Sequence, residues 1–357
     1  MRHIEKSSTR VKGLDLLKLI SAFLVVVIHC QPEIYEKEFL IAFCRIAVPI
    51  FFIINGFFWE HSNNASFKNG LLRIKKLAML TAFVIVIYSI YDTIIHILDC
   101  CFITEATALA EWKYQYTPIR VVTFILFNDS GAAYQCWYML ALIYTYAIVI
   151  FFDKKGKLTA LYRYAPFLSI IQYFMNIVVE CLLPKYNHGL LYRNWLFMAL
   201  PLFCIGASIG KAYQENKQRL YEKRKMFILC SFLILPLYTM EVLTIKYVFQ
   251  TYFELYLSTI ALALLLFLAG LTNELHSRLA DFLSRCGQMY SASIYCSHVL
   301  VGSVISLMIN VLAPNYFKSY CMFKPIIVFF SSLLIAILYK RLRKYILAKR
   351  IYLSHEN

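Results

Sequence analysis

Ten apolar stretches, each close to the length of a transmembrane helix and separated by short polar connections, constrain this chain more than any other feature. A membrane helix needs roughly 20 predominantly apolar residues, because the hydrocarbon core of a bilayer is about 30 Å thick. The composition agrees, since 61% of the 357 residues are hydrophobic and only 16% are charged, which is more apolar surface than one soluble core can bury. We therefore predict an all-α integral membrane protein, a bundle of about ten transmembrane helices. The predicted spans are residues 14–30, 39–59, 77–98, 134–152, 159–182, 194–211, 226–246, 252–272, 290–311 and 324–341.

The rest of the chain offers little room for another domain. Residues 117–128 form a shorter apolar piece that we interpret as re-entrant or interfacial. No stretch has the composition of a separate soluble domain, and we detect no internal repeat. We expect one transmembrane domain over residues 1–357, with cytoplasmic tails at 1–12 and 342–357.

The basic residues predict the orientation. The chain has a net charge of +16, and its cations gather in alternate connections. These connections are residues 2–12, 68–76, 154–157, 211–225 and 340–350. Because cytoplasmic loops carry the excess of Lys and Arg, we expect both termini in the cytoplasm and the protein in the cell (inner, cytoplasmic) membrane as a multi-pass protein. The same distribution argues against nucleic acid as a partner.

Several ionisable side chains lie within the predicted spans or at their outer ends. A charge at the bilayer centre costs about 3 kcal/mol on insertion scales, so each one needs a reason. Asp92 and His96, four residues apart, are expected to form a structural pair. The outer half is therefore rich in groups able to bind and ionise an acceptor. This set comprises His29, Arg45, Asp92, His96, Glu180, Arg193, Glu241 and Glu254.

The first span carries two ionisable side chains, Lys18 and His29, on one helix face. Lys18 and His29 are 11 residues apart, about three turns or roughly 16 Å along the axis. Between them the same face carries Ser21, Ala22 and Val25, all small or slender. A long thin ligand such as pantetheine, held by its nucleotide phosphates at the inner surface, would fit along this narrow helix face.

Simpler explanations stay open for these side chains. Lys18 either extends to the inner headgroups or pairs with Asp15 at the i, i+3 spacing. His29 is alternatively an interfacial histidine with ordinary hydrogen-bond partners. Arg45 is alternatively a structural partner of an acidic residue, Asp92 or Glu241.

Solvation is the favoured explanation for Glu180 and Glu254, which lie near the outer interface. Trp137 and Tyr138 open the fourth span there, and an aromatic belt is their commoner explanation.

Two other groups have a functional and a structural interpretation. Ser291, Tyr295 and His298 recur at helical spacing in the ninth span, so this polar stripe faces other helices or a cavity. Arg73 and Lys76 lie at the inner surface, where they either determine topology or bind phosphate.

Six segments together resemble the acyltransferase 3 family of membrane acyltransferases that modify cell-surface polysaccharides. The resemblance lies in their order and spacing within a ten-span frame and extends over nearly the whole chain. The segments are GLDLLKLISAFLVVVIHC (13–30), RIAVPIFFIINGFF (45–58), RIKK (73–76), CWYMLAL (136–142), YRNWLFMALPLFCIGASIGK (192–211) and SASIYCSH (291–298).

The resemblance implies a ten-helix fold with an acyl-CoA donor on the cytoplasmic side and His29 as the catalytic base. It further implies that Arg45 and Arg193 lie near the reacting centre. Two departures affect donor binding, because Lys18 and Lys76 replace the usual arginines and a lysine is a point charge without the bidentate fork. Family members often carry an extra periplasmic domain, which we expect to be absent after residue 350. By this resemblance the donor is bound by Lys18, Arg73 and Lys76. We predict that the acceptor is bound or oriented by Trp137, Tyr138, Arg193, Asn194, Ser291, Tyr295 and His298.

We predict a membrane O-acyltransferase, an enzyme that transfers groups other than aminoacyl groups. It would move an acetyl or other short acyl group from acyl-CoA, a co-substrate, to a hydroxyl of an extracytoplasmic or lipid-linked glycan. Either His29 deprotonates that hydroxyl with Arg45 stabilising the negative charge, or His29 first carries the acyl group itself. Expected partners are acyl-CoA, the saccharide acceptor and membrane lipids; no bound cofactor and no metal is expected.

Two other classes of function stay open. A transporter or flippase for a sugar lipid or small polar solute would also carry intramembrane charges. Such proteins commonly have inverted repeats and paired interrupted spans, and the sequence indicates neither. A non-catalytic membrane module of a sensor or racemase is the third class.

Overall fold

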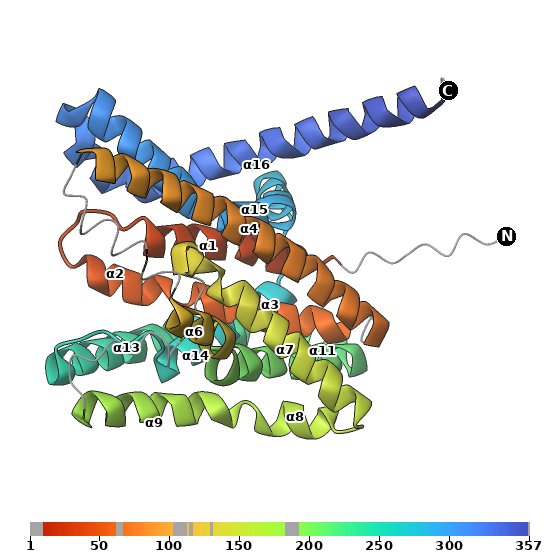
Figure 1. Ribbon diagram of the computed structural model, residues 1–357. Helices are drawn as coiled ribbons and strands as arrows, with labels where there is room; N and C mark the ends of the chain where they lie inside the picture. The colour runs from red at the N-terminus through yellow and green to blue at the C-terminus, as the bar shows by residue number, and fades with distance from the viewer. Residues whose placement is uncertain are drawn as a thin grey trace. The chain divides into compact units, whose positions relative to one another are not determined.

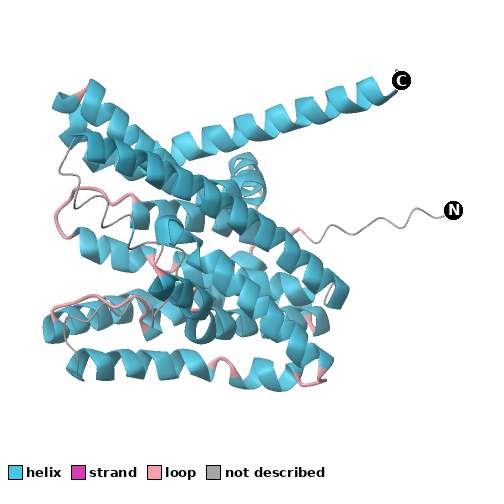
Figure 2. Ribbon diagram, in the orientation of Figure 1, coloured by secondary structure: helices cyan, strands magenta, loops and turns pink. Residues whose placement is uncertain are grey.

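The computed structural model describes residues 10–61, 67–102, 113, 117–128, 131–182 and 193–355. Every element in these ranges is a helix, and none is a strand (Figure 2). The all-α prediction is therefore confirmed for the described part of the chain. In chain order (Figure 1) the helices are α1 (Lys12–His29), α2 (Lys37–Cys44), α3 (Ala47–His61), α4 (Phe67–Phe102), α6 (Pro118–Phe127), η1 (Gly131–Cys136), α7 (Trp137–Lys154), α8 (Leu158–Tyr164), α9 (Phe167–Leu182), η2 (Trp195–Ala199), α11 (Leu200–Glu215), α12 (Lys217–Glu222), α13 (Arg224–Phe249), α14 (Leu257–Thr272), α15 (Arg278–Leu312), η3 (Pro314–Tyr316) and α16 (Phe317–His355).

Each predicted span coincides with a helix or with two helices in succession. Within the described ranges, 8 helical segments are long and apolar enough to cross a membrane, so the protein is a multi-pass membrane protein. The predicted spans outside this set are α1 and α14. Helix α1 has 18 residues but carries three charged side chains in its first two turns. Helix α14 has 16 residues, about 24 Å at 1.5 Å per residue, and is short for a bilayer.

Two of the predicted spans contain a two-residue turn, although each still forms one candidate span of 25 residues. The second span turns at Arg45–Ile46 between α2 and α3, and the fifth is broken at Ala165–Pro166 between α8 and α9. Figure 1 shows α8 and α9 nearly in line, with a short gap between them. Proline explains both breaks, because Pro49 and Pro166 lack the N–H that would bond to the carbonyl four residues earlier.

The short apolar piece predicted at 117–128 is the 10-residue helix α6, which begins with Pro118 and ends at Phe127. Its length is half of a membrane span, so the expectation of a segment that does not cross the bilayer agrees with the structure. Whether it is re-entrant or interfacial stays a prediction.

The chain divides into two compact units, the first mainly Val48–Asn273 and the second Lys12–Ala47 with Glu274–Asn357. The second unit is built on α1, α15 and α16, which pack against one another. A Cβ atom on Gly287 would overlap the carbonyl oxygen of Asp15, so α15 approaches the backbone of α1 directly. Further along, a Cβ on Gly302 would lie 2.9 Å from the sulfur of Cys30. These glycines determine how closely α1 and α15 lie.

The first unit uses glycines in the same way between α3 and α11. A Cβ on Gly56 would overlap the carbonyl oxygen of Phe203, and one on Gly206 would overlap that of Ile53. A Cβ on Gly210 would lie 2.8 Å from the carbonyl oxygen of Phe57. Small residues at such spacing allow membrane helices to approach closely where no hydrophobic effect drives their association.

We expect Gly206→Ala to destabilise the protein, because the added methyl group would overlap the backbone carbonyl oxygen of Ile53. A backbone atom cannot move aside by changing rotamer, as a side chain can. Overpacking of this kind costs about 1–3 kcal/mol. The measurement is the thermal unfolding midpoint of the purified protein in detergent. Ser208→Ala is the matched control, since Ser208 lies on the same helix but is exposed. Equal midpoints for the two variants would contradict the packing described here.

Candidate functional site

Two histidines from distant parts of the sequence lie side by side in the second unit. The rings of His29, the last residue of α1, and His298 of α15 have centroids 5.2 Å apart and planes tilted by 44°. The thiol of Cys30 lies 4.0 Å from the carbonyl oxygen of His298, which holds the end of α1 at this level of α15. Sequence analysis gave both histidines a functional role, and the structure brings them together.

The hydrogen bonds of His298 determine its tautomer. Its Nδ1 lies 2.8 Å from the carbonyl oxygen of Tyr295 and 3.1 Å from that of Ile294. Because a carbonyl oxygen only accepts, Nδ1 carries the hydrogen and Nε2 of the neutral ring is an acceptor. His298 is fully buried, and its Nε2 has no hydrogen-bond partner among the described residues. An acceptor nitrogen is therefore held in the interior beside His29.

The polar stripe predicted on the ninth span faces the interior, as expected. Ser291, Tyr295 and His298 are all buried on α15. The Tyr295 and His298 rings have centroids 6.1 Å apart.

Lys18 forms the ion pair that was one of its two simpler explanations. Its Nζ lies 3.0 Å from Oδ1 of Asp15, one turn earlier on α1. Ser21, Ala22 and Val25, which separate Lys18 from His29 along the helix, are buried. The hydroxyl of Ser21 has no hydrogen-bond partner within the described residues. A ligand passage along this face stays a prediction.

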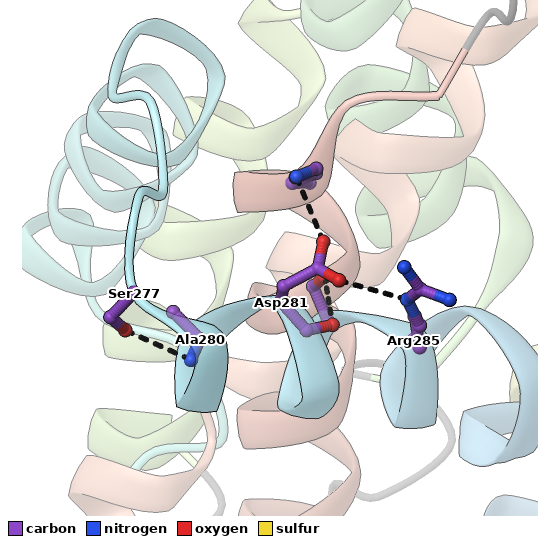
Figure 3. A network of polar contacts seen from close by, with 6 residues as sticks. Ser277, Ala280, Asp281 and Arg285 are labelled. Carbon is purple, nitrogen blue, oxygen red and sulfur yellow. Dashed lines mark hydrogen bonds and ion pairs between the residues drawn. The ribbon is translucent and has the colours of Figure 1, made fainter.

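A second carboxylate joins α1 to α15 near the start of both helices (Figure 3). Asp281 accepts from Nε of Arg285 at 2.9 Å and pairs with Lys12 at 2.8 Å. Ser277 begins α15 by accepting a hydrogen bond from the backbone N–H of Ala280. Sequence analysis missed this network, because its residues lie 269 positions apart (281 − 12) and carry no motif.

Arg45 lies at the turn between α2 and α3. Its backbone N–H donates to the carbonyl oxygens of Ile41 and Ala42, which ends α2, and its side chain is half-buried. The predicted arginine is therefore at a helix interruption and not within a continuous span.

In the first unit, Arg73 of α4 is packed against aromatic rings. Its guanidinium carbon lies 5.4 Å from the centre of the Trp59 ring and 6.0 Å from that of Tyr146. It also donates to the carbonyl oxygen of Phe58 at 3.4 Å. Arg73 is half-buried, whereas Lys76 on the next turn is exposed. Arg73 and Lys76, two of the three residues predicted to bind the donor, thus have different surroundings.

Tyr138 belongs to a buried hydrogen-bond network and not to an aromatic belt. Asn55 donates to the Tyr138 hydroxyl at 2.8 Å, and the Tyr146 hydroxyl donates to Asn55 Oδ1 at 3.3 Å. Trp137 is buried as well. The belt explanation for Trp137 and Tyr138 was wrong, because a belt residue faces the membrane interface.

Arg193 and Asn194 have defined structural partners. Arg193 forms a two-pronged ion pair with Glu254, with N–O distances of 2.6 and 3.2 Å. Asn194 Oδ1 accepts from the backbone N–H groups of Leu196 and Phe197 and caps η2, a single turn of π-helix. Solvation as the explanation for Glu254 was therefore wrong.

Asn128 connects several of the predicted residues. Its amide nitrogen donates to the carbonyl oxygens of Arg193, at 2.8 Å, and Trp137, at 3.3 Å. Its amide oxygen accepts from the backbone N–H of Trp195 at 3.2 Å. Asn128 is fully buried and has a φ of 54°, a conformation that asparagine tolerates better than most residues. The sequence signal was its place after an apolar helix, which favours Asn or Gly.

The remaining intramembrane carboxylates are structural or buried. Asp92 and His96 form the expected pair, 3.6 Å apart. Glu241 of α13 accepts from the backbone N–H groups of Leu257 and Ser258 and so caps α14. Glu180 is buried on α9, and solvation was the wrong explanation for it.

Comparison with known proteins places this chain beside membrane acyltransferases. A family model described as an acyltransferase domain matches residues 11–339. An amino-acid racemase from Enterococcus faecalis is 27% identical over 231 residues, which cover 58% of this chain and 29% of the racemase. The chain thus spans less than a third of that relative. No solved structure matches.

We expect Asn128→Gly to lower the thermal unfolding midpoint, although glycine adopts a φ of 54° without strain. The loss leaves two carbonyl oxygens and one N–H without their partner, at about 1–3 kcal/mol for each buried group left unsatisfied. Asn128→Asp should also destabilise, because it aims a carboxylate at two carbonyl oxygens. A midpoint of Asn128→Gly equal to that of the wild type would show that these hydrogen bonds do not hold the Arg193 segment.

Proposed function

The chain belongs to the acyltransferase 3 family, and from this premise we propose that it is a membrane O-acyltransferase. It transfers an acetyl or other short acyl group from acyl-CoA at the cytoplasmic face to a hydroxyl of an extracytoplasmic or lipid-linked glycan. Membership of the family supports acyl transfer in general; the donor and the acceptor are part of the proposal.

The pair of His29 and His298 carries this proposal. General-base catalysis needs an imidazole in a defined orientation at a protected site. His29 is the last residue of α1 and lies about three turns after Lys18. Its ring lies 5.2 Å from that of a fully buried histidine, His298. In the proposal, the acceptor nitrogen of His298 orients either His29 or the acceptor hydroxyl, with Tyr295 beside it.

The proposed reaction is direct transfer. His29 takes the proton of the acceptor hydroxyl as that oxygen bonds to the thioester carbonyl carbon. The tetrahedral intermediate then loses the CoA thiolate as the carbon–sulfur bond breaks, and His29 returns the proton to the leaving sulfur. Arg45 stabilises the negative charge on the carbonyl oxygen, the role for which a fixed cation is most effective.

In the proposal, the two substrates bind from opposite faces of the membrane. Lys18, Arg73 and Lys76 bind the CoA phosphates, and Trp137, Tyr138, Arg193, Asn194 and Ser291 bind or orient the glycan. With α1 and α14 counted as crossings, the 8 clear spans become ten, and an even number puts both termini on one side of the membrane. In the proposal this side is the cytoplasm and the membrane is the inner membrane. The matched family residues and the alternating basic connections support this arrangement.

A transporter or flippase is the second candidate, and one observation favours it. The broken spans α2–α3 and α8–α9 are of the kind that transporters use at their binding sites. Acyl-CoA-dependent transfer by the purified protein separates the two candidates, because a transporter gives none.

We expect His29→Ala to lower the acyl-transfer rate by about 10²–10⁴-fold, the usual contribution of a general base. The measurement is the transfer of radiolabelled acetyl from acetyl-CoA to glycan by the purified, monodisperse protein. His276→Ala is the control, since this histidine is largely exposed. An active His29→Ala variant would remove His29 from the chemistry.

We expect Lys18→Ala to raise the KM for acetyl-CoA and to leave the KM for the glycan unchanged, because Lys18 is assigned to the donor. Removing Lys18 leaves the buried Asp15 carboxylate without this partner, so a double variant, Asp15→Asn with Lys18→Met, separates binding from folding. Lys318→Ala, an exposed lysine of the same unit, is the control. A rise in the glycan KM alone would contradict the assignment.

A further inference from the structure

Asn55, near the middle of α3, connects two tyrosines of α7 through one amide group. Its Nδ2 donates to the carbonyl oxygen of Phe51 at 2.9 Å and to the hydroxyl of Tyr138 at 2.8 Å. These two bonds use both hydrogens of the amide, and the Phe51 carbonyl oxygen only accepts, so the orientation of the amide is fixed. Its Oδ1 accepts from the hydroxyl of Tyr146 at 3.3 Å.

Tyr146 is 5% exposed, and its ring is one of two that face the guanidinium of Arg73. The guanidinium carbon lies 6.0 Å from the centre of the Tyr146 ring and 5.4 Å from that of Trp59. The centroids of these two rings, from α7 and α3, are 5.6 Å apart. A cation within about 6 Å of an aromatic face is attracted by the ring, so both rings restrain the guanidinium.

The start of α4 lies close to α3 and α7 because of Gly70, one turn before Arg73. A Cβ on Gly70 would lie 2.6 Å from Cδ1 of Ile150 and 3.0 Å from Cη2 of Trp59. The guanidinium also donates to the carbonyl oxygen of Phe58 at 3.4 Å. Arg73 is therefore held by groups on two other helices.

Orientation matters for an arginine that binds phosphate. A guanidinium is planar and presents its N–H donors in a fixed fork, so it makes two parallel hydrogen bonds to a phosphate only when its plane is correctly turned. A lysine is a point charge and needs no such alignment. Among Lys18, Arg73 and Lys76, the three residues assigned to the donor, Arg73 is thus the one whose binding depends on its surroundings.

We propose that Asn55 is a positioning residue for the donor, because its amide oxygen fixes the Tyr146 hydroxyl and the Tyr146 ring fixes the guanidinium of Arg73. Loss of the bond between Asn55 and Tyr146 lets the ring shift, and the arginine keeps its charge but loses its alignment. The expected effect is about tenfold weaker binding of CoA, the effect of one hydrogen bond. The role of Arg73 in donor binding rests on the proposed function.

The binding test measures the dissociation constant of CoA by isothermal titration calorimetry, with the full chain in lipid nanodiscs. Asn55→Leu and Tyr146→Phe should each weaken CoA binding about tenfold, and the double variant should lie within about threefold of either one. With Arg73→Ala in place, Asn55→Leu should weaken binding by less than about twofold.

Two results would overturn the proposal. One is a combined loss near a hundredfold in the double variant, and the other is a tenfold loss from Asn55→Leu with Arg73→Ala in place, since each means that Asn55 acts independently. If Asn55→Leu is not recovered folded, Tyr146→Phe removes the same hydrogen bond and replaces it in the Arg73→Ala background. A wild type that binds no CoA would overturn the proposal as well.

The transfer assay uses acetyl-CoA and deacylated surface glycan extracted from cells that lack the protein. Tyr146→Phe should raise the KM for acetyl-CoA about tenfold and leave kcat and the glycan KM within about twofold. Thr145→Val is the matched control, because it removes a fully buried hydrogen bond of the same helix, from Thr145 to the carbonyl oxygen of Ala141. This control should leave both KM values unchanged.

The outcomes separate this proposal from the proposed function. An equal rise in both KM values for Tyr146→Phe, or the same rise in Thr145→Val, means a general loss of packing and overturns the role of Asn55 alone. Binding of CoA that depends on Asn55 through Arg73, without any acyl transfer by the wild type, would leave that role standing and contradict the proposed function.

Discussion

At Gly287 there is no space for a side chain, because the carbonyl oxygen of Asp15 occupies the position that a Cβ atom would take. This backbone contact holds α1 against α15, and the ion pair of Lys12 with Asp281 ties the same two helices near their starts. Since both helices are rigid, the contact determines which residue of α15 meets the end of α1. His29 consequently lies beside His298, and the proposed chemistry depends on that meeting.

Broken helices account for much of the remaining polar structure. A helix end leaves backbone groups without partners, and inside a membrane only the protein can satisfy them. Asn194 caps η2, and Glu241 caps α14. Asn128 bridges the segments around Trp137 and Arg193. The polar residues of the first unit therefore hold irregular backbone in place, which is where binding sites of membrane proteins are found.

Apolar length predicted the helices well, because the bilayer imposes it on every span. The turns were missed, since Pro49 and Pro166 lie next to interruptions of the helix whereas Pro236 and Pro325 lie inside continuous helices. The sequence around each proline does not separate the two cases. Spacing on one helix predicted the Lys18–Asp15 pair and the buried stripe of α15. The position of Asn128 after an apolar helix predicts its backbone conformation, but no local signal identifies the distant partners of Asn128 or Asp281.

The proposed chemistry requires the acyl donor to extend along α1 and to present its thioester to His29. Cryo-electron microscopy of the protein with a non-transferable thioether analogue of acetyl-CoA tests it most directly. We expect density for the nucleotide near Lys18 and for the analogue's carbonyl group beside His29 and His298. An analogue bound away from α1, or a His29 ring facing lipid acyl chains, would contradict it.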